Sequence, residues 1–262
     1  MNPLNTPVAF GLFVGREDGA QEARSLTSAV QARLRAEIIA CRFRPGEKLA
    51  IATLSKRFQV SYALVREALS RLMADGLVVA EDQRGFRASP LSLADLRDLT
   101  QTRVEIEGLA LRRSMARGND AWRSFVDETW QSLDAAGRPA TEMSESEHET
   151  WSTRHARFHS ALVGVCGLDN LLRFRAVLYE RTERYRRLAP LIRAKPRDVQ
   201  AEHLAIRNAV LAGDADAASA LMAAHLQRTA DDIVRSCREH GWPDTLDSDP
   251  VSPRPEEMAC ST

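Results

Sequence analysis

Residues 60–77 read VSYALVREALSRLMADGL, and this stretch predicts a short helix with a definite start and end. Apolar residues recur in it every three or four positions, which is the spacing of one helix face. Ser61 is a residue type that caps helix N-termini, and Gly76 is one that ends helices. A second short helix, expected from about 52 to 57, comes just before it. Two short helices joined by a tight turn predict a helix-turn-helix, whose second helix fits the major groove of DNA.

The residues that follow predict a small β-hairpin. Residues 77–80 and 86–89 alternate in polarity on either side of EDQRG, which carries turn-forming residues. A hairpin placed after a recognition helix is a wing. Its Arg84 and Gly85 are expected to approach the DNA backbone or the minor groove, glycine because a side chain there would hold the two chains apart.

Basic and polar side chains on these elements are expected to contact DNA. Residues 25–90 contain eleven Lys or Arg and six acidic residues, although the whole chain has a formal net charge of zero. Such a local excess suits a module that neutralises phosphates, although charge alone would fit a solvated surface equally well. We expect phosphate contacts from Lys56, Arg57, Arg66, Arg84 and Gly85, and base contacts from Ser61, Tyr62 and Arg66.

The run from 34 to 90 resembles the DNA-binding domain of the GntR family of bacterial transcription regulators. Spaced blocks carry the resemblance in the right order: Ile38-Ile39, Phe43-Arg44-Pro45-Gly46-Glu47-Lys48-Leu49, Leu54-Ser55, Val60-Ser61, Val65-Arg66-Glu67-Ala68-Leu69, Leu72, Gly76-Leu77-Val78 and Arg84-Gly85-Phe86. Regulators of this family resemble one another in forming homodimers that bind palindromic sites. The resemblance therefore implies a homodimer on a two-fold symmetric operator in double-stranded DNA.

Two departures from the family pattern bear on base reading. Ile51-Ala52 stands where the family commonly has Glu, often followed by Arg, and Tyr62-Ala63-Leu64 stands where Arg-Thr-Pro is usual. An arginine reads guanine through two hydrogen bonds, whereas Tyr62 offers one hydroxyl or a stacking face. The operator sequence is therefore not carried over from relatives.

Length and composition limit the possible domain organisation of the chain. Its 262 residues are too many for one winged helix, and we predict a winged helix-turn-helix at 25–90 and a helical domain at 91–240. Residues 1–24 and 241–262 lack periodicity and are expected to be flexible tails. The four cysteines lack CxxC spacing, which argues against a zinc ribbon or a redox pair. No stretch approaches the roughly 18 to 20 apolar residues of a membrane span, so we expect a cytoplasmic protein with no membrane partner.

From Ser92 onward the apolar spacing is helical throughout, which predicts an all-α bundle of six to seven helices. The expected fold class is therefore mainly α, with an N-terminal winged helix-turn-helix and a small hairpin. The bundle resembles the FCD effector-binding domain of the FadR subfamily within GntR. The residues that carry this resemblance are Arg103, Glu107, Phe158-His159, Glu202-His203, Ala209, Gly213-Asp214, Met222 and His225-Leu226.

Four histidines of the bundle form a candidate metal site. His155 and His159 are four residues apart and share a helix face, while His203 and His225 lie in apolar stripes of two later helices. A buried imidazole must be hydrogen-bonded or bind an ion, because an unpaired buried polar group costs about 1–3 kcal/mol. Taken singly, each histidine is more simply explained as a hydrogen-bonded core or surface residue. An i,i+4 pair with two more histidines from other helices is how bundles build metal sites.

The FCD resemblance implies the same site. The family's metal motif has an Asp four residues before a His, followed by one His in each of two later helices, and His155 stands here in place of the Asp. Four neutral imidazoles favour a divalent transition metal, zinc or nickel first, over magnesium or manganese. Without a carboxylate the site keeps its full positive charge and holds an anionic ligand more strongly, unless His155 turns to solvent and leaves three ligands. His148 and His240 fit neither pattern and are expected at the surface.

Other long side chains have two interpretations each. Arg103 stands at the family position that often faces the effector, which implies contact with a carboxylate, and a salt bridge to Glu105, Glu107 or another helix is the equal alternative. The arginines at 181, 184, 186 and 187 are interpreted as a solvated helix face rather than as pocket lining. Trp122 and Trp130 are eight residues apart and are assigned to the core.

Together these features predict a ligand-responsive transcriptional repressor that binds a metal ion and a small carboxylate or related metabolite. We expect no enzyme activity and assign no catalytic residue. One alternative is a metal-dependent enzyme fused to a DNA-binding module, because zinc on imidazoles activates water. Against it, Glu202 points about 100° away from the face of His203, and a site with four imidazoles is closed. The other alternative is a metal sensor in which the ion itself is the signal.

Overall fold

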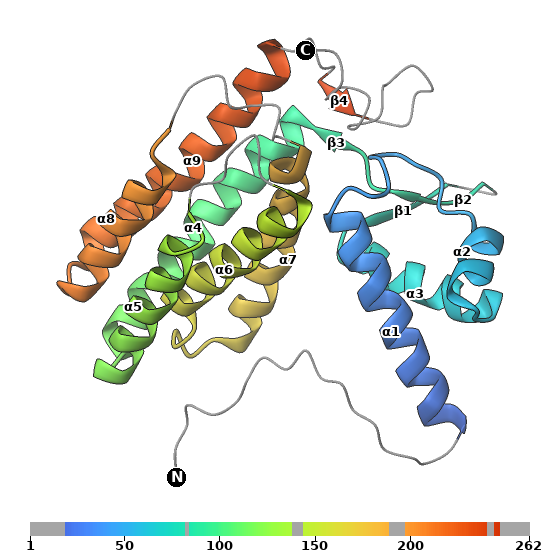
Figure 1. The fold of residues 1–262 in the computed structure, drawn as a ribbon, viewed down its shortest axis with the longest axis horizontal. Coiled ribbons are helices and arrows are strands. Elements are labelled where there is room, and N and C mark those ends of the chain that lie inside the picture. The colour runs from blue at the N-terminus through green and yellow to red at the C-terminus, as the bar shows by residue number, and fades with distance from the viewer. Residues whose placement is uncertain (1–18, 82–83, 138–143, 189–196, 240–243, 247–262) are drawn as a thin grey trace.

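The computed structural model describes residues 19–81, 84–137, 144–188, 197–239 and 244–246 (Figure 1). Within these ranges the chain forms nine helices and two small antiparallel sheets. The N-terminal part contains α1 (Gly19–Ile39), α2 (Ile51–Phe58), α3 (Tyr62–Ala74), β1 (Val78–Glu81) and β2 (Gly85–Ala88). The predicted fold class, a winged helix-turn-helix joined to a helical bundle, is confirmed.

The helix-turn-helix is formed by α2 and α3, and local chemistry defines the turn between them. Gln59 ends α2 with φ 55°, in the left-handed region, and the Ser61 hydroxyl accepts a hydrogen bond from the Leu64 amide at 3.3 Å. Gly76, with φ 69°, ends α3. The buried face of α3 packs against α1, and it consists of Val65, Ala68, Leu69 and Leu72.

The wing follows α3 directly. Val78 of β1 lies opposite Ala88 of β2, and Glu81 lies opposite Gly85. Each strand is displaced by one residue from the predicted range. Gly85 has φ 98°, a conformation that glycine adopts without strain, and a side chain there would meet open space.

Six helices form the bundle, which meets the predicted number. They are α4 (Leu93–Arg117), α5 (Asp120–Asp134), α6 (Glu145–Val163), α7 (Asp169–Leu188), α8 (Val199–Leu211) and α9 (Ala215–Glu239). The bundle lies on one side of the molecule and the winged helix on the other, with α1 in contact with α7 (Figure 1). Helix α4 contacts α6, α7 and α9 and so runs through the middle of the bundle. The bundle core includes Phe158, Leu162, Ile206, Val210 and Met222.

Two stretches differ from the predicted flexible tails. Helix α1 begins at Gly19, inside 1–24, and β4 (Thr245–Leu246), inside 241–262, pairs with β3 (Leu91–Ser92). The second pairing joins segments that are far apart in the sequence, so no local pattern could reveal it. The remainder of both predicted tails lies outside the described residues. None of the helices described here has the length and apolar character needed to cross a membrane.

Candidate metal centre

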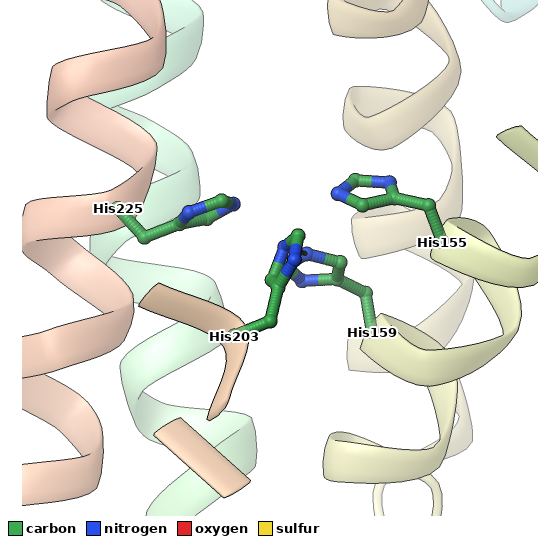
Figure 2. Close-up of side chains that lie close together, drawn as sticks. All are labelled: His155, His159, His203 and His225. Carbon is green, nitrogen blue, oxygen red and sulfur yellow. Dashed lines mark hydrogen bonds between the residues drawn. The ribbon is translucent and has the colours of Figure 1, made fainter. Parts of the chain in front are cut away.

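Three helices bring the four histidines to one place in the bundle. His155 and His159 come from α6, His203 comes from α8, and His225 comes from α9 (Figure 2). One candidate ligand nitrogen from each ring lies within 4.8 Å of all the others, and no side chain among them is more than 5% exposed. The predicted convergence of these residues is confirmed, and ion binding stays a prediction.

Ring packing holds the imidazoles in this arrangement. The rings of His155 and His159 have centroids 4.4 Å apart, as expected for residues one helical turn apart. The rings of His203 and His225 have centroids 4.6 Å apart, although they come from different helices. Phe158 is fully buried and lies edge-on to His203 at 5.5 Å. This aromatic packing leaves the rings little freedom to turn away from one another.

Burial keeps the four imidazoles uncharged. Desolvation holds the pKa of His155, His159 and His203 well below the usual value of histidine, and the charge of Arg186 lowers the pKa of His155 further. Burial also lowers the pKa of His225, although its hydrogen bond to Glu202 opposes the shift. Neutral imidazoles have a free nitrogen lone pair at neutral pH, which is what a metal ligand requires.

The donor set fits a divalent transition metal. Nitrogens bound tetrahedrally at about 2.0–2.1 Å lie roughly 3.3–3.4 Å from one another. The four candidate nitrogens lie within 4.8 Å of one another, so the rings would move inward to bind one ion. The Nε2 atoms of His159 and His203 lie 3.2 Å apart, and the buried Nδ1 of His159 has no hydrogen-bond partner among the described residues. Nitrogen donors without a carboxylate suit zinc, nickel or copper better than magnesium or manganese.

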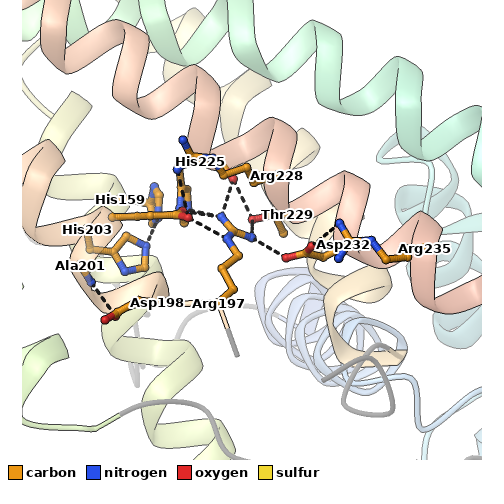
Figure 3. Close-up of polar contacts among 11 residues, drawn as sticks. His159, Arg197, Asp198, Ala201, His203, His225, Arg228, Thr229, Asp232 and Arg235 are labelled. Atoms are coloured by element: carbon orange, nitrogen blue, oxygen red, sulfur yellow. Dashed lines mark hydrogen bonds and ion pairs between the residues drawn. The ribbon is translucent and has the colours of Figure 1, made fainter. Parts of the chain in front are cut away.

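Glu202 of α8 orients His225, a role that the sequence did not reveal (Figure 3 shows the surrounding contacts). Its Oε2 lies 2.9 Å from Nδ1 of His225, and Arg197 pairs with the same carboxylate. Burial alone would raise the pKa of Glu202, but hydrogen bonds from Arg197 and His225 hold it far below its usual value. The ionised Glu202 is therefore an acceptor, and His225 donates from Nδ1, which leaves the Nε2 lone pair free.

Helix α7 supplies three further side chains to the site: Arg175 and Tyr179, which the sequence did not suggest, and Arg186, for which pocket lining was the weaker alternative. The Tyr179 hydroxyl lies 3.0 Å from Nδ1 of His155, and Nη1 of Arg186 lies 2.9 Å from the same atom. Arg175 pairs with Glu107 of α4 at 2.8 Å. Residues 175, 179 and 186 share one helix face, so their spacing was the signal that could have identified them.

The interpretation of the arginine run as a solvated face is wrong for three of its members, since the Arg187 side chain is 13% exposed and pairs with Glu149 and Glu183. Arg184 is 1% exposed and donates to the carbonyl of Ser89, and Arg186 contacts His155. The guanidinium of Arg186 also lies 4.9 Å from the ring of Trp151. Helical spacing alone did not show that α7 is packed between α4 and α1.

Two buried arginines lie close to the histidines. Arg103 and Arg175 both pair with Glu107, at 3.0 and 2.8 Å, and lie 5.2 and 5.6 Å from the Tyr179 ring. Burial would raise the pKa of Glu107, yet Arg175 and Arg103 lower it, so the carboxyl is ionised. Nε of Arg103 and Nη2 of Arg175 have no hydrogen-bond partner among the described residues. The salt-bridge alternative for Arg103 is thus observed, with one positive charge in excess.

The residues predicted to contact DNA lie on the helix-turn-helix and the wing. Exposed side chains among them are Lys56 and Arg57 on α2, Tyr62 and Arg66 on α3, and Arg84 beside Gly85 in the wing. Ser61 uses its hydroxyl to cap α3. Arg57 pairs with Glu37 at 2.8 Å and is therefore less free to reach a phosphate. DNA contact stays a prediction for all seven residues.

The other two histidines do not join the cluster. His148 is partly buried on α6, with its Nδ1 3.5 Å from the Ser152 hydroxyl. His240 lies outside the described residues. Trp122 is buried as predicted, and its indole N–H donates to the carbonyl of Ala161 at 2.8 Å.

Comparisons with known proteins assign both parts of the chain to known families. Residues 26–87 match the family described as bacterial regulatory proteins, gntR family, and residues 98–228 match the FCD domain. The chain is 39% identical to an uncharacterized HTH-type transcriptional regulator, BphR of Paraburkholderia xenovorans, over 78% of this chain and 83% of that protein. It is 34% identical to the HTH-type transcriptional repressor GlaR of Escherichia coli, over 74% of this chain and 89% of that one. The solved structure of E. coli McbR/YncC has the same fold, with a TM-score of 0.67 at 19% identity over 80% of this chain and 97% of that one.

Proposed function

The chain belongs to the GntR family of bacterial regulatory proteins and carries an FCD domain, and from this premise we propose how it responds to a ligand. It is a transcriptional regulator, not an enzyme, with a DNA-binding domain and a ligand-binding domain. The proposal is that a zinc or nickel ion held by His155, His159, His203 and His225, with a small carboxylate beside it, controls DNA binding.

The single observation that carries this proposal is the convergence of four buried, uncharged imidazoles. Without an ion, the inward Nε2 atoms of His159 and His203 share one hydrogen bond at 3.2 Å in a site where unmet hydrogen-bonding capacity is costly. A bound ion would supply a concentrated positive charge that attracts an anionic ligand. Glu202 orients His225 for this role.

The buried arginines support a carboxylate as the effector. Arg103 and Arg175 share one carboxylate, Glu107, so one positive charge beside the histidines is not balanced by this group. Each guanidinium also has a buried N–H group without a partner among the described residues. An anion that reached the site would accept from these donors and offset the charge. We therefore assign Arg103 to effector binding.

The remaining assignments follow from the family and the exposed surface of the winged helix. We assign residues 25–90 to DNA binding and 91–240 to the metal and the effector, in a member of the FadR subfamily. A homodimer would present two copies of α3 to a palindromic operator, with contacts from Lys56, Arg57, Ser61, Tyr62, Arg66, Arg84 and Gly85. The name of GlaR, a repressor, favours repression, and a bacterial DNA-binding protein acts in the cytoplasm, where the DNA is.

Removal of ligand histidines tests the metal site. Wild-type protein should take up about one zinc or nickel ion per chain and unfold at a higher temperature when loaded. His159→Ala and His225→Ala should each lower the metal affinity at least about tenfold to a hundredfold, since outer-shell changes already have effects of that size. Metal affinity is measured by competition with a chelator, and His148→Ala serves as the control because His148 lies outside the cluster.

The metal assignment fails if wild-type protein at neutral pH binds neither ion and its melting temperature does not change. Separate titrations of metal and of candidate carboxylic acids against operator binding then distinguish an effector-responsive regulator from a metal sensor. In the sensor, metal alone would change operator affinity to its full extent.

Substitution of Arg66 tests the recognition helix. Arg66→Ala should weaken the operator complex by about 1–3 kcal/mol and reduce the salt dependence of binding by about one ion, because a charged contact to DNA is lost. Arg71→Ala, further along α3 and paired with Glu67, is the matched control. Fluorescence anisotropy with operator DNA at several salt concentrations measures both quantities. Equal affinity of wild type and Arg66→Ala would contradict the assignment of α3.

A further inference from the structure

We propose that two positioning residues on α7 make His155 a conditional metal ligand. In the metal-free protein Arg186 prevents coordination by His155, and Tyr179 supports coordination once the contact with Arg186 is broken. This inference rests on the metal site proposed above and concerns how that site is loaded.

The first step of the argument is the hydrogen-bond chemistry of Arg186. A guanidinium has only donors, so Nδ1 of His155, which lies 2.9 Å from Nη1 of Arg186, must be the acceptor. An imidazole whose Nδ1 accepts from a guanidinium has its one ring proton on the other nitrogen. That proton is therefore on Nε2. In Figure 2 one nitrogen of His155 points toward the other three rings, and the other faces away from them.

The nitrogen of His155 that faces the cluster is thus an N–H group without a lone pair. Nδ1 is occupied by Arg186 and Tyr179, so Nε2 is the atom left to point inward. His225 has the opposite arrangement. The ionised Glu202 lies 2.9 Å from its Nδ1 and can only accept, whereas Nη2 of Arg197 is farther from that nitrogen, at 3.4 Å, so Nδ1 donates to Glu202 and Nε2 is ready to coordinate. The other two histidines, His159 and His203, share one hydrogen bond between their Nε2 atoms at 3.2 Å.

The second step concerns what must change when His155 coordinates through Nε2. Nε2 gives up its proton to solvent and Nδ1 takes one up, so the ring stays neutral and no other reactant is needed. The new N–H at Nδ1 requires an acceptor, which the hydroxyl oxygen of Tyr179 provides at 3.0 Å. Arg186 has no lone pair to offer, so it must move away.

Arg186 has another hydrogen-bonding partner when its contact with His155 is broken. It already pairs with Glu183, one turn earlier on α7, at 3.3 Å, and its side chain is not fully buried. The movement therefore does not leave the guanidinium without a partner. The protein can therefore bind an ion through His159, His203 and His225 first. His155 becomes the fourth ligand only when Arg186 breaks its hydrogen bond with Nδ1 of His155.

Three single substitutions test whether Arg186 opposes, and Tyr179 supports, metal coordination by His155. Arg186→Gln replaces a donor by a group whose amide oxygen can accept from Nδ1–H, so it should raise zinc affinity by about tenfold. Tyr179→Phe removes the acceptor and should lower zinc affinity by a similar factor. Arg187→Gln makes the same change at the next residue, which pairs with Glu149 and Glu183, and should change the affinity less than about twofold. Competition with a chelator measures all three against wild type.

The Arg187→Gln control distinguishes the effect of a lost hydrogen bond on zinc affinity from the effect of a lost positive charge. Equal gains in affinity for Arg186→Gln and Arg187→Gln would mean that the lost positive charge is the cause, which would overturn the inference. No gain for Arg186→Gln, or no loss for Tyr179→Phe, would overturn it as well. Melting temperatures of the metal-free variants show whether each one is folded.

A second measurement uses the wild-type protein and no metal. Long-range ¹H–¹⁵N NMR spectra of the histidine rings report which nitrogen carries the proton. We expect the proton of His155 on Nε2 and that of His225 on Nδ1. A proton on Nδ1 of His155 would overturn this inference alone, whatever the zinc affinity. Wild-type protein that binds no zinc would overturn the metal site itself, even if the ring protons were as expected.

Discussion

For each histidine, the nitrogen turned away from the cluster determines what the inward nitrogen can do. Glu202 accepts a hydrogen bond from Nδ1 of His225, Arg186 donates to Nδ1 of His155, and Nδ1 of His159 has no partner among the described residues. The four imidazoles are therefore chemically unequal, although all are buried. Among the described residues, only His225 has the carboxylate partner that commonly supports a ligand histidine.

The burial of these rings predicts a specific pH dependence of stability. Because their folded-state pKa values are lowered, the unfolded chain takes up protons below pH about 6.5 that the metal-free folded protein does not bind. Stability should be level above that pH and fall below it, by up to about 1.4 kcal/mol per pH unit for each such histidine. Urea unfolding of metal-free protein between pH 8 and 5 measures this slope.

Two variants give the pH experiment its controls. His159→Ala should make the slope shallower, because one buried imidazole is gone, whereas His148→Ala should leave it closer to the wild-type value. Stability that stays constant or rises as the pH falls from 7 to 5 would contradict the neutral state assigned to the cluster.

At the scale of helices and strands, the N-termini of helices are largely predictable from sequence, because the capping residue lies next to the helix that it caps. Ser61, Ser92, Asn119 and Asp214 each accept a hydrogen bond from a backbone amide in the first turn of the helix that follows. The start of α6 has a complete capping box, in which the Ser144 hydroxyl accepts from the Glu147 amide and the Glu147 carboxylate accepts from the Ser144 amide. Strand β4 was missed because its partner lies far away in the sequence.

Helix α7 has two functional faces, and only one could be anticipated from spacing. Tyr179 and Arg186 contact His155 of the candidate metal site, and Arg175, on the same face, pairs with Glu107 beside it. Contacts in other directions join α7 to the start of α4 and to the winged helix, through Glu180 to Arg35, Arg181 to Asp95, and Arg184 to the carbonyl of Ser89. Any movement of Arg186 therefore takes place on an element that also contacts the DNA-binding part.

At the scale of the whole molecule, Arg35 links the DNA-binding part to the bundle. It comes from α1 and pairs with Asp75, at the end of α3, and with Glu180 of α7. Burial raises the pKa of Glu180 despite the nearby Arg35, which indicates a contact partly withdrawn from water. One side chain thus contacts the end of α3 and α7, the helix that packs against the four histidines.

Arg35→Ala should weaken the communication between metal and DNA. The ratio of operator affinities with and without zinc should move toward one, while the free energy of unfolding should fall by about 1 kcal/mol or less per pair, because these pairs are partly exposed. Operator titrations of metal-loaded and metal-free protein measure the ratio. Arg33→Ala, which breaks a pair with Glu37 within α1, is the control. An unchanged ratio in Arg35→Ala would show that communication follows another route.

The sequence by itself determined the class of fold, the helix-turn-helix and the four candidate ligand histidines, because each of these depends on local spacing: a helical period, a cap, a turn, an i,i+4 pair. Only the tertiary structure decided the partners of those histidines. Glu202, Tyr179 and Arg186 lie 23 to 31 residues away in sequence from the rings they contact. Which nitrogen carries a proton depends on such contacts, and they exist only once α6, α7, α8 and α9 have packed together.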